Sequence, residues 1–100
     1  MVQATTPTFV CTVDNSADLS EIAVMYFTLK QDLVEVTKSG EDVVIDGQKV
    51  SVYLTQAETL PFKKGQAEVM LNWTYQNGAR GCTYKKVIQV EDNLLQKVVE

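Results

Sequence analysis

The chain has 100 residues with a net charge of −4, and 45% of the residues are apolar. This length predicts a single β-sandwich domain over residues 1–100, with a tail at 91–100, and the apolar content argues against disorder. The acidic balance argues against a nucleic-acid partner, because the phosphate backbone attracts a positively charged surface. No apolar run approaches the ~20 residues of a membrane-spanning helix. The first seven residues do not resemble a signal peptide, so we expect a cytoplasmic chain without a membrane partner.

The first two predicted strands cover residues 8–13 and 21–30. Residues 8–13 are rich in β-branched side chains and follow Pro7, whose missing N–H is tolerated at the start of a strand. Residues 21–30 are apolar on both of their faces. Such a strand is expected to be buried on both sides. In a small sandwich only one face meets the core, so a loop, a helix or another chain must cover the other.

One face of residues 21–30 carries Ala23, Met25, Phe27 and Leu29. We expect the chain's own loop or tail, or another subunit, to cover this face, because an exposed apolar strand face promotes association. Met25, Phe27 and Leu29 are therefore the candidate partner interface, and self-association is the favoured form of contact. The alternative cover is the tail, in which apolar residues recur at helical spacing, namely Leu94, Leu95, Val98 and Val99.

Three shorter strands are predicted in the middle of the chain, over residues 33–37, 43–45 and 49–55. Asp46-Gly47 separates the last two of them, and this dipeptide is typical of two-residue hairpin turns. The short, regular spacing of strands and turns is typical of an antiparallel sandwich rather than of alternating strands and helices.

One short helical turn is predicted after these strands. Thr55 and Glu58 have the spacing of a capping box, in which each side chain bonds to the backbone N–H of the other residue. Pro61 disfavours helical backbone in the residue before it, so the turn is expected to end there. Phe62 is then expected to enter the core beneath the turn.

The clearest strand signal lies in residues 66–75, where apolar and polar side chains alternate. Asn77-Gly78 is expected to supply the positive φ angles of a tight hairpin turn, and residues 79–90 form the returning strand. Trp73 shares its parity with Val69 and Leu71, which indicates a buried side chain. A role for Trp73 as an exposed sugar-stacking platform is the alternative.

The chain has two cysteines, Cys11 and Cys82, and no histidine. Two buried, reduced thiols that pack as small apolar side chains are the simplest interpretation. A disulfide between adjacent strands is the alternative. No histidine is present to activate a catalytic thiol or to bind a metal, and two distant cysteines do not make a zinc site. We therefore expect a protein that is not an enzyme and needs no metal or cofactor.

Taken together, these segments predict an all-β fold, an antiparallel immunoglobulin-like sandwich of about seven strands with one short helical turn. Five segments also carry a family resemblance, namely 5–14, 19–22, 24–27, 44–47 and 50–60. They resemble small proteins of about this length that are encoded in phages and prophages of Firmicutes and other gut bacteria. The most specific pieces are Thr-Thr-Pro-Thr at 5–8 and Leu-Thr-Gln-Ala-Glu-Thr-Leu at 54–60.

This resemblance covers nearly the whole chain and implies a β-sandwich encoded among virion structural genes, such as a tail or baseplate component made in the bacterial cytoplasm. It implies no catalytic residues. Residues 83–86 depart from the family, because they replace a more apolar segment of the last strand. The leading hypothesis is a non-enzymatic structural or assembly protein that acts through protein–protein contacts. The alternative is a carbohydrate- or peptide-binding sandwich for surface recognition.

Overall fold

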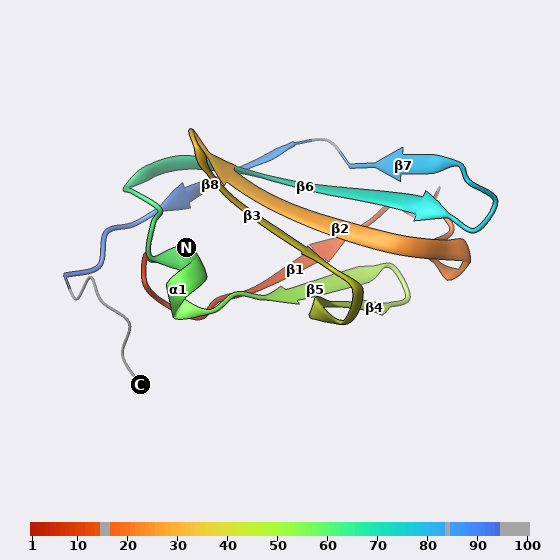
Figure 1. Cartoon of the computed structure of the whole chain (residues 1–100), viewed down its shortest axis with the longest axis horizontal. Helices are drawn as coiled ribbons and strands as arrows, with labels where there is room; N and C mark the ends of the chain where they lie inside the picture. Colours follow the sequence, from red (N-terminus) through yellow and green to blue (C-terminus); the bar gives the residue numbers. More distant parts are fainter. Residues whose placement is uncertain (15–16, 84, 95–100) are drawn as a thin grey trace.

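The computed structural model describes residues 1–14, 17–83 and 85–94, which form two β-sheets packed face to face (Figure 1). The smaller sheet has three strands in the order β1 (Thr8–Thr12), β5 (Lys49–Tyr53) and β4 (Val43–Asp46). The larger sheet has five strands, in the order β3 (Val34–Ser39), β2 (Ile22–Gln31) and β6 (Gly65–Tyr75), followed by β7 (Arg80–Cys82) and β8 (Lys86–Val90), which both pair with β6. Three single turns of helix complete the fold, η1 (Leu19–Glu21), η2 (Gly40–Asp42) and α1 (Gln56–Thr59).

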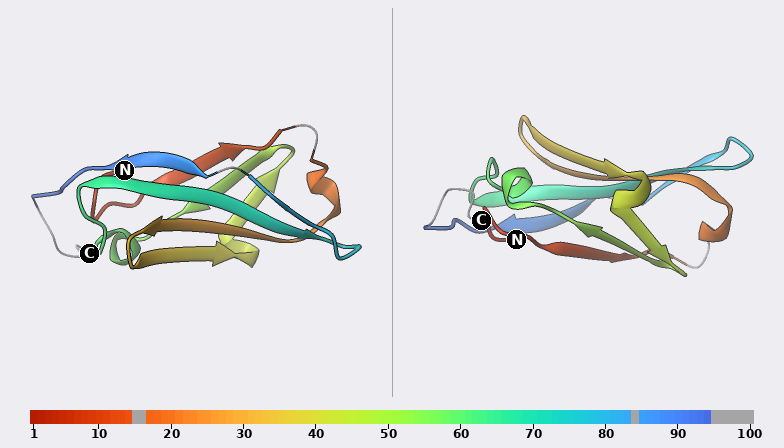
Figure 2. Two further views of the ribbon diagram at one scale, coloured as in Figure 1. Left: turned by 90° about the horizontal axis from the view of Figure 1, so that it is seen from above. Right: turned by 60° about the horizontal axis from the view of Figure 1, so that its bottom comes forward.

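The strand order is that of an immunoglobulin-like sandwich. The small sheet, β1-β5-β4, corresponds to strands B, E and D, and the large sheet, β3-β2-β6-β7/β8, corresponds to strands C′, C, F and G. A parallel bridge between Val2 and Glu91 adds the N-terminal residues to the end of β8. Figure 2 shows the two layers in two further views, and η2 connects β3 of the five-stranded sheet to β4 of the three-stranded sheet. The predicted all-β fold class is confirmed.

The core lies between the two sheets. Phe9 on β1 and Phe27 on β2 join the layers, with their ring centroids 5.4 Å apart at a tilt of 44°. Phe62 is fully buried after α1, as its place behind the capping box predicts. Trp73 is also buried, with 4% of its surface exposed, so the core interpretation is confirmed and the sugar-platform alternative is wrong. The remaining core residues include Leu19, Val50, Val52, Leu54, Ala67, Val69, Leu71 and Val90.

Strand β2 contains a β-bulge that changes which of its residues face the core. Ile22 pairs with Tyr75 and Val24 pairs with Thr74, so Ala23 is an extra residue without a partner opposite. Ala23 is exposed, whereas Ile22 packs against the core. The prediction that Ala23 shares the face of Met25 is therefore wrong, because strict alternation does not continue through the bulge.

Both tight turns differ in detail from the predicted ones. Asp46 and Lys49 are paired, so the two-residue loop is Gly47-Gln48, and Gly47 has a φ of +60°. A positive φ at only the first loop residue is the pattern of a type II′ turn. In the β6–β7 hairpin, the N–H of Tyr75 bonds to the carbonyl of Ala79, which leaves a three-residue loop. Only Gly78 in that loop has a positive φ.

The predicted last strand, residues 79–90, is divided into β7 and β8, so the described residues contain eight strands rather than seven. β7 pairs with the second half of β6 and β8 pairs with its first half. Thr83 extends the pairing of β7, because its N–H bonds to the carbonyl of Leu71 and its Oγ1 accepts from the N–H of the same residue. β7 ends at Cys82 and β8 begins at Lys86.

The capping box that begins α1 is present as predicted. Thr55 Oγ1 accepts from the N–H of Glu58, and a Glu58 carboxylate oxygen accepts from the N–H of Thr55. Thr59, which is fully buried, donates to the carbonyl of Thr5 and accepts from its N–H, so α1 holds the N-terminal segment in place. Within the described part of the chain, no helix is long and apolar enough to cross a membrane. Most of the predicted tail at 91–100, namely residues 95–100, lies outside the described residues.

Candidate protein interface

The three residues predicted to form the partner interface are interior residues. Met25 is 3% exposed, and Phe27 and Leu29 are fully buried. They face the three-stranded sheet, so the chain's own second sheet covers them and neither a tail nor a partner is required. The prediction that these side chains form a partner interface is therefore corrected. The opposite face of β2, with Val24 and Tyr26, is the outer face of the sandwich and is only partly apolar.

A different surface carries the exposed apolar side chains. In the three-stranded sheet, the strand register aligns Val10 with Ser51 and Ser51 with Val44, which places all three in one row on the outer face. Val10 is 60% exposed and Val44 is 59% exposed. The pair Thr8–Tyr53 flanks this row on one side, and Tyr53 is 53% exposed.

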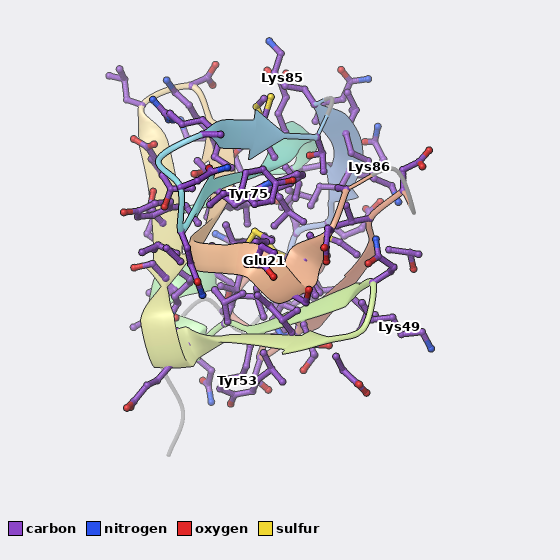
Figure 3. The ribbon with its side chains drawn as sticks, turned by 90° about the vertical axis from the view of Figure 1, so that its right-hand side faces the viewer. Glu21, Lys49, Tyr53, Tyr75, Lys85 and Lys86 are labelled. Atoms are coloured by element: carbon purple, nitrogen blue, oxygen red, sulfur yellow. The ribbon has the colours of Figure 1, made fainter. Side chains whose placement is uncertain are left out.

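A second flanking row contains Thr12, Lys49 and Asp46, again through direct register partners on the three strands. We call the surface formed by these rows the small-sheet face. In Figure 3, Tyr53 and Lys49 lie on the side of the three-stranded sheet that points away from the five-stranded sheet. The middle row of this face carries no charge. The exposed valines and the tyrosine beside them are typical of protein-contact surfaces, whereas the lysine and aspartate of the second row are of residue types that such surfaces contain less often.

The end of the small-sheet face that carries Tyr53 is hollowed and acidic. A hollow of about 390 Å³ lies beside Tyr53, and Glu41, Asp42 and Lys38 contribute to its lining. The Lys38 ammonium is 2.7 Å from a Glu58 carboxylate oxygen and is thereby neutralised. The carboxylates of Glu41 and Asp42 therefore give this end of the face a net negative charge.

The opposite end of the face is fixed by the β4–β5 turn. The side-chain amide of Gln48 donates to the carbonyls of Val13, Asp14 and Ala17, at 3.2, 2.9 and 3.1 Å. These bonds attach the turn to the segment between β1 and β2. The same bonds hold the backbone in place at Lys49, the next residue.

The outer face of the five-stranded sheet is more polar. Lys30 has Glu35 and Glu68 as its register partners on either side, and Lys85 lies 3.4 Å from Glu68. Opposite charges therefore alternate across this face and compensate one another. A hollow of about 330 Å³ lies among these groups and is also lined by Thr28, Met70 and Asn72. Charged, hydroxyl and amide groups in this lining can bond to a ligand, although more of the lining surface is apolar than polar.

Neither cysteine forms a disulfide, so the predicted alternative of a bridge between adjacent strands is wrong. Cys11 is half-buried against the core, and this burial raises the pKa of its thiol, although the nearby Lys86 ammonium acts in the opposite direction. Cys82 is exposed, so the expectation that both thiols are buried is wrong for this residue. The two cysteines lie on different sheets, in β1 and β7.

Among the described residues, no group of three or more histidine, cysteine, aspartate or glutamate side chains is arranged to hold a metal ion. Comparison with known proteins adds no relative, since no family model, no curated protein and no solved structure matches the chain. The candidate protein interface is therefore assigned only from the exposed residues of the small-sheet face. The small-sheet face was missed in the sequence because its apolar residues come from three separate strands.

Proposed function

We propose that this protein is a non-enzymatic structural or assembly module that acts through protein–protein contacts, with the small-sheet face as its contact surface. The observation that carries the proposal is the row Val10–Ser51–Val44. The two valines of this row are exposed on β1 and β4, the strands that pair with β5 on either side. Single exposed apolar residues are ordinary, but an aligned pair on the outer face of a sheet is a candidate interface.

The setting that we propose for this module is a phage or prophage particle, as the family resemblance implies. An immunoglobulin-like sandwich suits that role because its two sheets hold the outer strands rigidly and leave their outward side chains free for contact. The pairs Phe9–Phe27 and Thr5–Thr59 join separate parts of the sandwich and support such rigidity.

Incorporation into particles tests this proposal. Val10→Lys combined with Val44→Lys places two ammonium groups in the middle of the small-sheet face without touching the core. We expect this variant to fold but to be absent from particles purified after induction of the host bacterium that carries the gene. The matched control is Val87→Lys combined with Thr37→Lys, which adds the same charge at exposed positions on the outer face of the five-stranded sheet. Equal incorporation of both variants would contradict the proposed contact surface.

A second candidate function is supported by the hollow on the five-stranded sheet. Thr28, Asn72 and Glu68 offer hydroxyl, amide and carboxylate groups there, and Tyr26, the register partner of Asn72, is partly exposed beside them. This combination fits a carbohydrate or a peptide. Chemical-shift changes at Asn72 and Thr28 on addition of soluble oligosaccharides would favour this function over the first.

A further inference from the structure

We infer that the partner of the small-sheet face is a second copy of this chain, packed face to face so that Lys49 of each copy meets the acidic end of the other. This inference rests on the proposed function, because it names the occupant of the same face. It follows from how the charges are distributed along β5. Lys49 is at the first residue of that strand and Tyr53, beside the acidic hollow, is at the last.

The symmetry of the contact follows from the register. Consider a two-fold axis that lies in the interface along the row Val10–Ser51–Val44. This axis maps the row onto the same row of the partner copy, and it maps the Lys49 end of the face onto the Tyr53 end. Each valine then meets its own equivalent in the partner copy. Lys49 is placed over Tyr53 of the partner copy, which allows a cation–π contact and brings the ammonium near the carboxylates of Glu41 and Asp42.

The other two-fold arrangement is disfavoured by the same charges. An axis parallel to the strands would place Lys49 over Lys49 of the partner copy, and like charges in contact are repulsive. In the favoured arrangement one kind of like-charged contact remains and occurs twice by symmetry, since Asp46 of each copy approaches Asp42 of the other. Both lie on the β4 side, at the open edge of the sheet, where water and salt screen their repulsion.

The size of the face predicts a weak contact. Three strands about 4.8 Å apart and five residues about 3.4 Å apart make a patch of about 10–15 Å by 17 Å. A standard stable interface covers about 800 Å² on each partner, which is more than this patch can supply. The isolated protein is therefore expected to dimerise only at high concentration, and the contact to gain strength when copies are held close together in an assembly.

Charge exchange between two variants tests the inference. Lys49→Glu replaces the lysine that meets the acidic end of the other copy, and the double substitution Glu41→Lys with Asp42→Lys reverses the charge of that acidic end. We expect each variant alone to dimerise at least tenfold more weakly than the wild-type chain in sedimentation equilibrium at low salt. Mixing the two variants should restore association, because both ends of the mixed pair then bring opposite charges together. Lys64→Glu, an equal charge change at an exposed position away from the face, should dimerise as the wild-type chain does.

The outcomes separate this inference from the proposed function. A wild-type chain that remains monomeric at millimolar concentration, or a mixture of variants that does not associate, overturns the second copy as partner. If Val10→Lys with Val44→Lys is nevertheless excluded from particles, the face still contacts a protein, and only the identity of the partner is wrong. Circular dichroism and thermal melting confirm that each variant is folded before the comparison.

Discussion

Trp73 on β6 and Gly81 on β7 are register partners, and the indole ring occupies the space where a side chain at residue 81 would lie. A Cβ atom built on Gly81 would be 2.6 Å from Cε2 of the Trp73 ring. The φ of Gly81 is not positive, so the requirement for glycine comes from the neighbouring ring and not from the backbone. This pair connects the short strand β7 to the core.

Gly81→Ala is therefore expected to destabilise the fold by about 1–3 kcal/mol, because the added methyl group displaces the indole from its packed position. Urea unfolding measures this cost. The same substitution in a Trp73→Leu background should cost much less, since the smaller side chain leaves space for the methyl group. An equal cost in both backgrounds would show that the ring is not the cause.

Trp73→Ala is expected to cost about 3–5 kcal/mol, because removing a large buried side chain leaves a cavity between the sheets. Trp73 is the single tryptophan of the chain, so fluorescence excited selectively at tryptophan, and not at the tyrosines, reports on this position alone. The native protein should show a blue-shifted emission maximum that moves to longer wavelength on unfolding. A solvent-exposed maximum in the native protein would contradict the buried placement.

Glu58 predicts a pH dependence of stability. Burial opposes ionisation of this carboxyl, but the hydrogen bonds from Lys38 and Thr55 outweigh it and leave the pKa of Glu58 below its ordinary value. A lowered folded-state pKa contributes stability above the unfolded value of about 4.3, and this contribution is lost as the pH falls through the folded-state value.

Glu58→Gln should therefore lower the free energy of unfolding at pH 7 by at most about 1 kcal/mol, because the pair is partly solvated. The difference between the wild-type chain and the variant should narrow as the pH falls from about 4.3 toward 2. Urea titrations at pH 7 and pH 2.5 measure both values. A difference that stays constant between the two pH values would exclude ionisation of Glu58 as its source.

Metal removal is expected to leave the fold unchanged. The described residues contain no arrangement of three potential ligand side chains, and the chain has no histidine. The melting temperature in the presence of EDTA should equal that in its absence. A decrease of several degrees would reveal a structural metal ion that this interpretation does not include.

Much of the fold could be predicted from local patterns. Alternation over residues 66–75 identified the buried face of β6, and Thr55 with Glu58 identified the start of α1, because each depends on side chains only a few positions apart. The bulge at Ala23 could not be predicted in the same way. It depends on how β2 pairs with β6, which is a contact between residues about 50 positions apart.

The candidate protein interface could be predicted from local sequence patterns even less well than the fold. Met25, Phe27 and Leu29 were assigned to an interface because β2 is apolar on both parities, and the sequence does not say which parity meets the other sheet. The small-sheet face depends on the register of three strands. Val10 and Val44 become neighbours of Ser51 only when β1 and β4 pair with β5. Local periodicity contains no information about that pairing.

Protection of the small-sheet face in the assembled state tests the central claim most directly. Ser51→Cys, introduced after Cys11 and Cys82 are replaced by alanine, places a thiol in the middle row of this face. Thr28→Cys in the same background places a thiol on the outer face of the five-stranded sheet. The rate of thiol labelling is measured for the isolated chain and for the chain in purified particles. We expect labelling at residue 51 to slow at least tenfold in particles while labelling at residue 28 is unchanged. Equal labelling at residue 51 in both states would contradict the claim that this face is the contact surface.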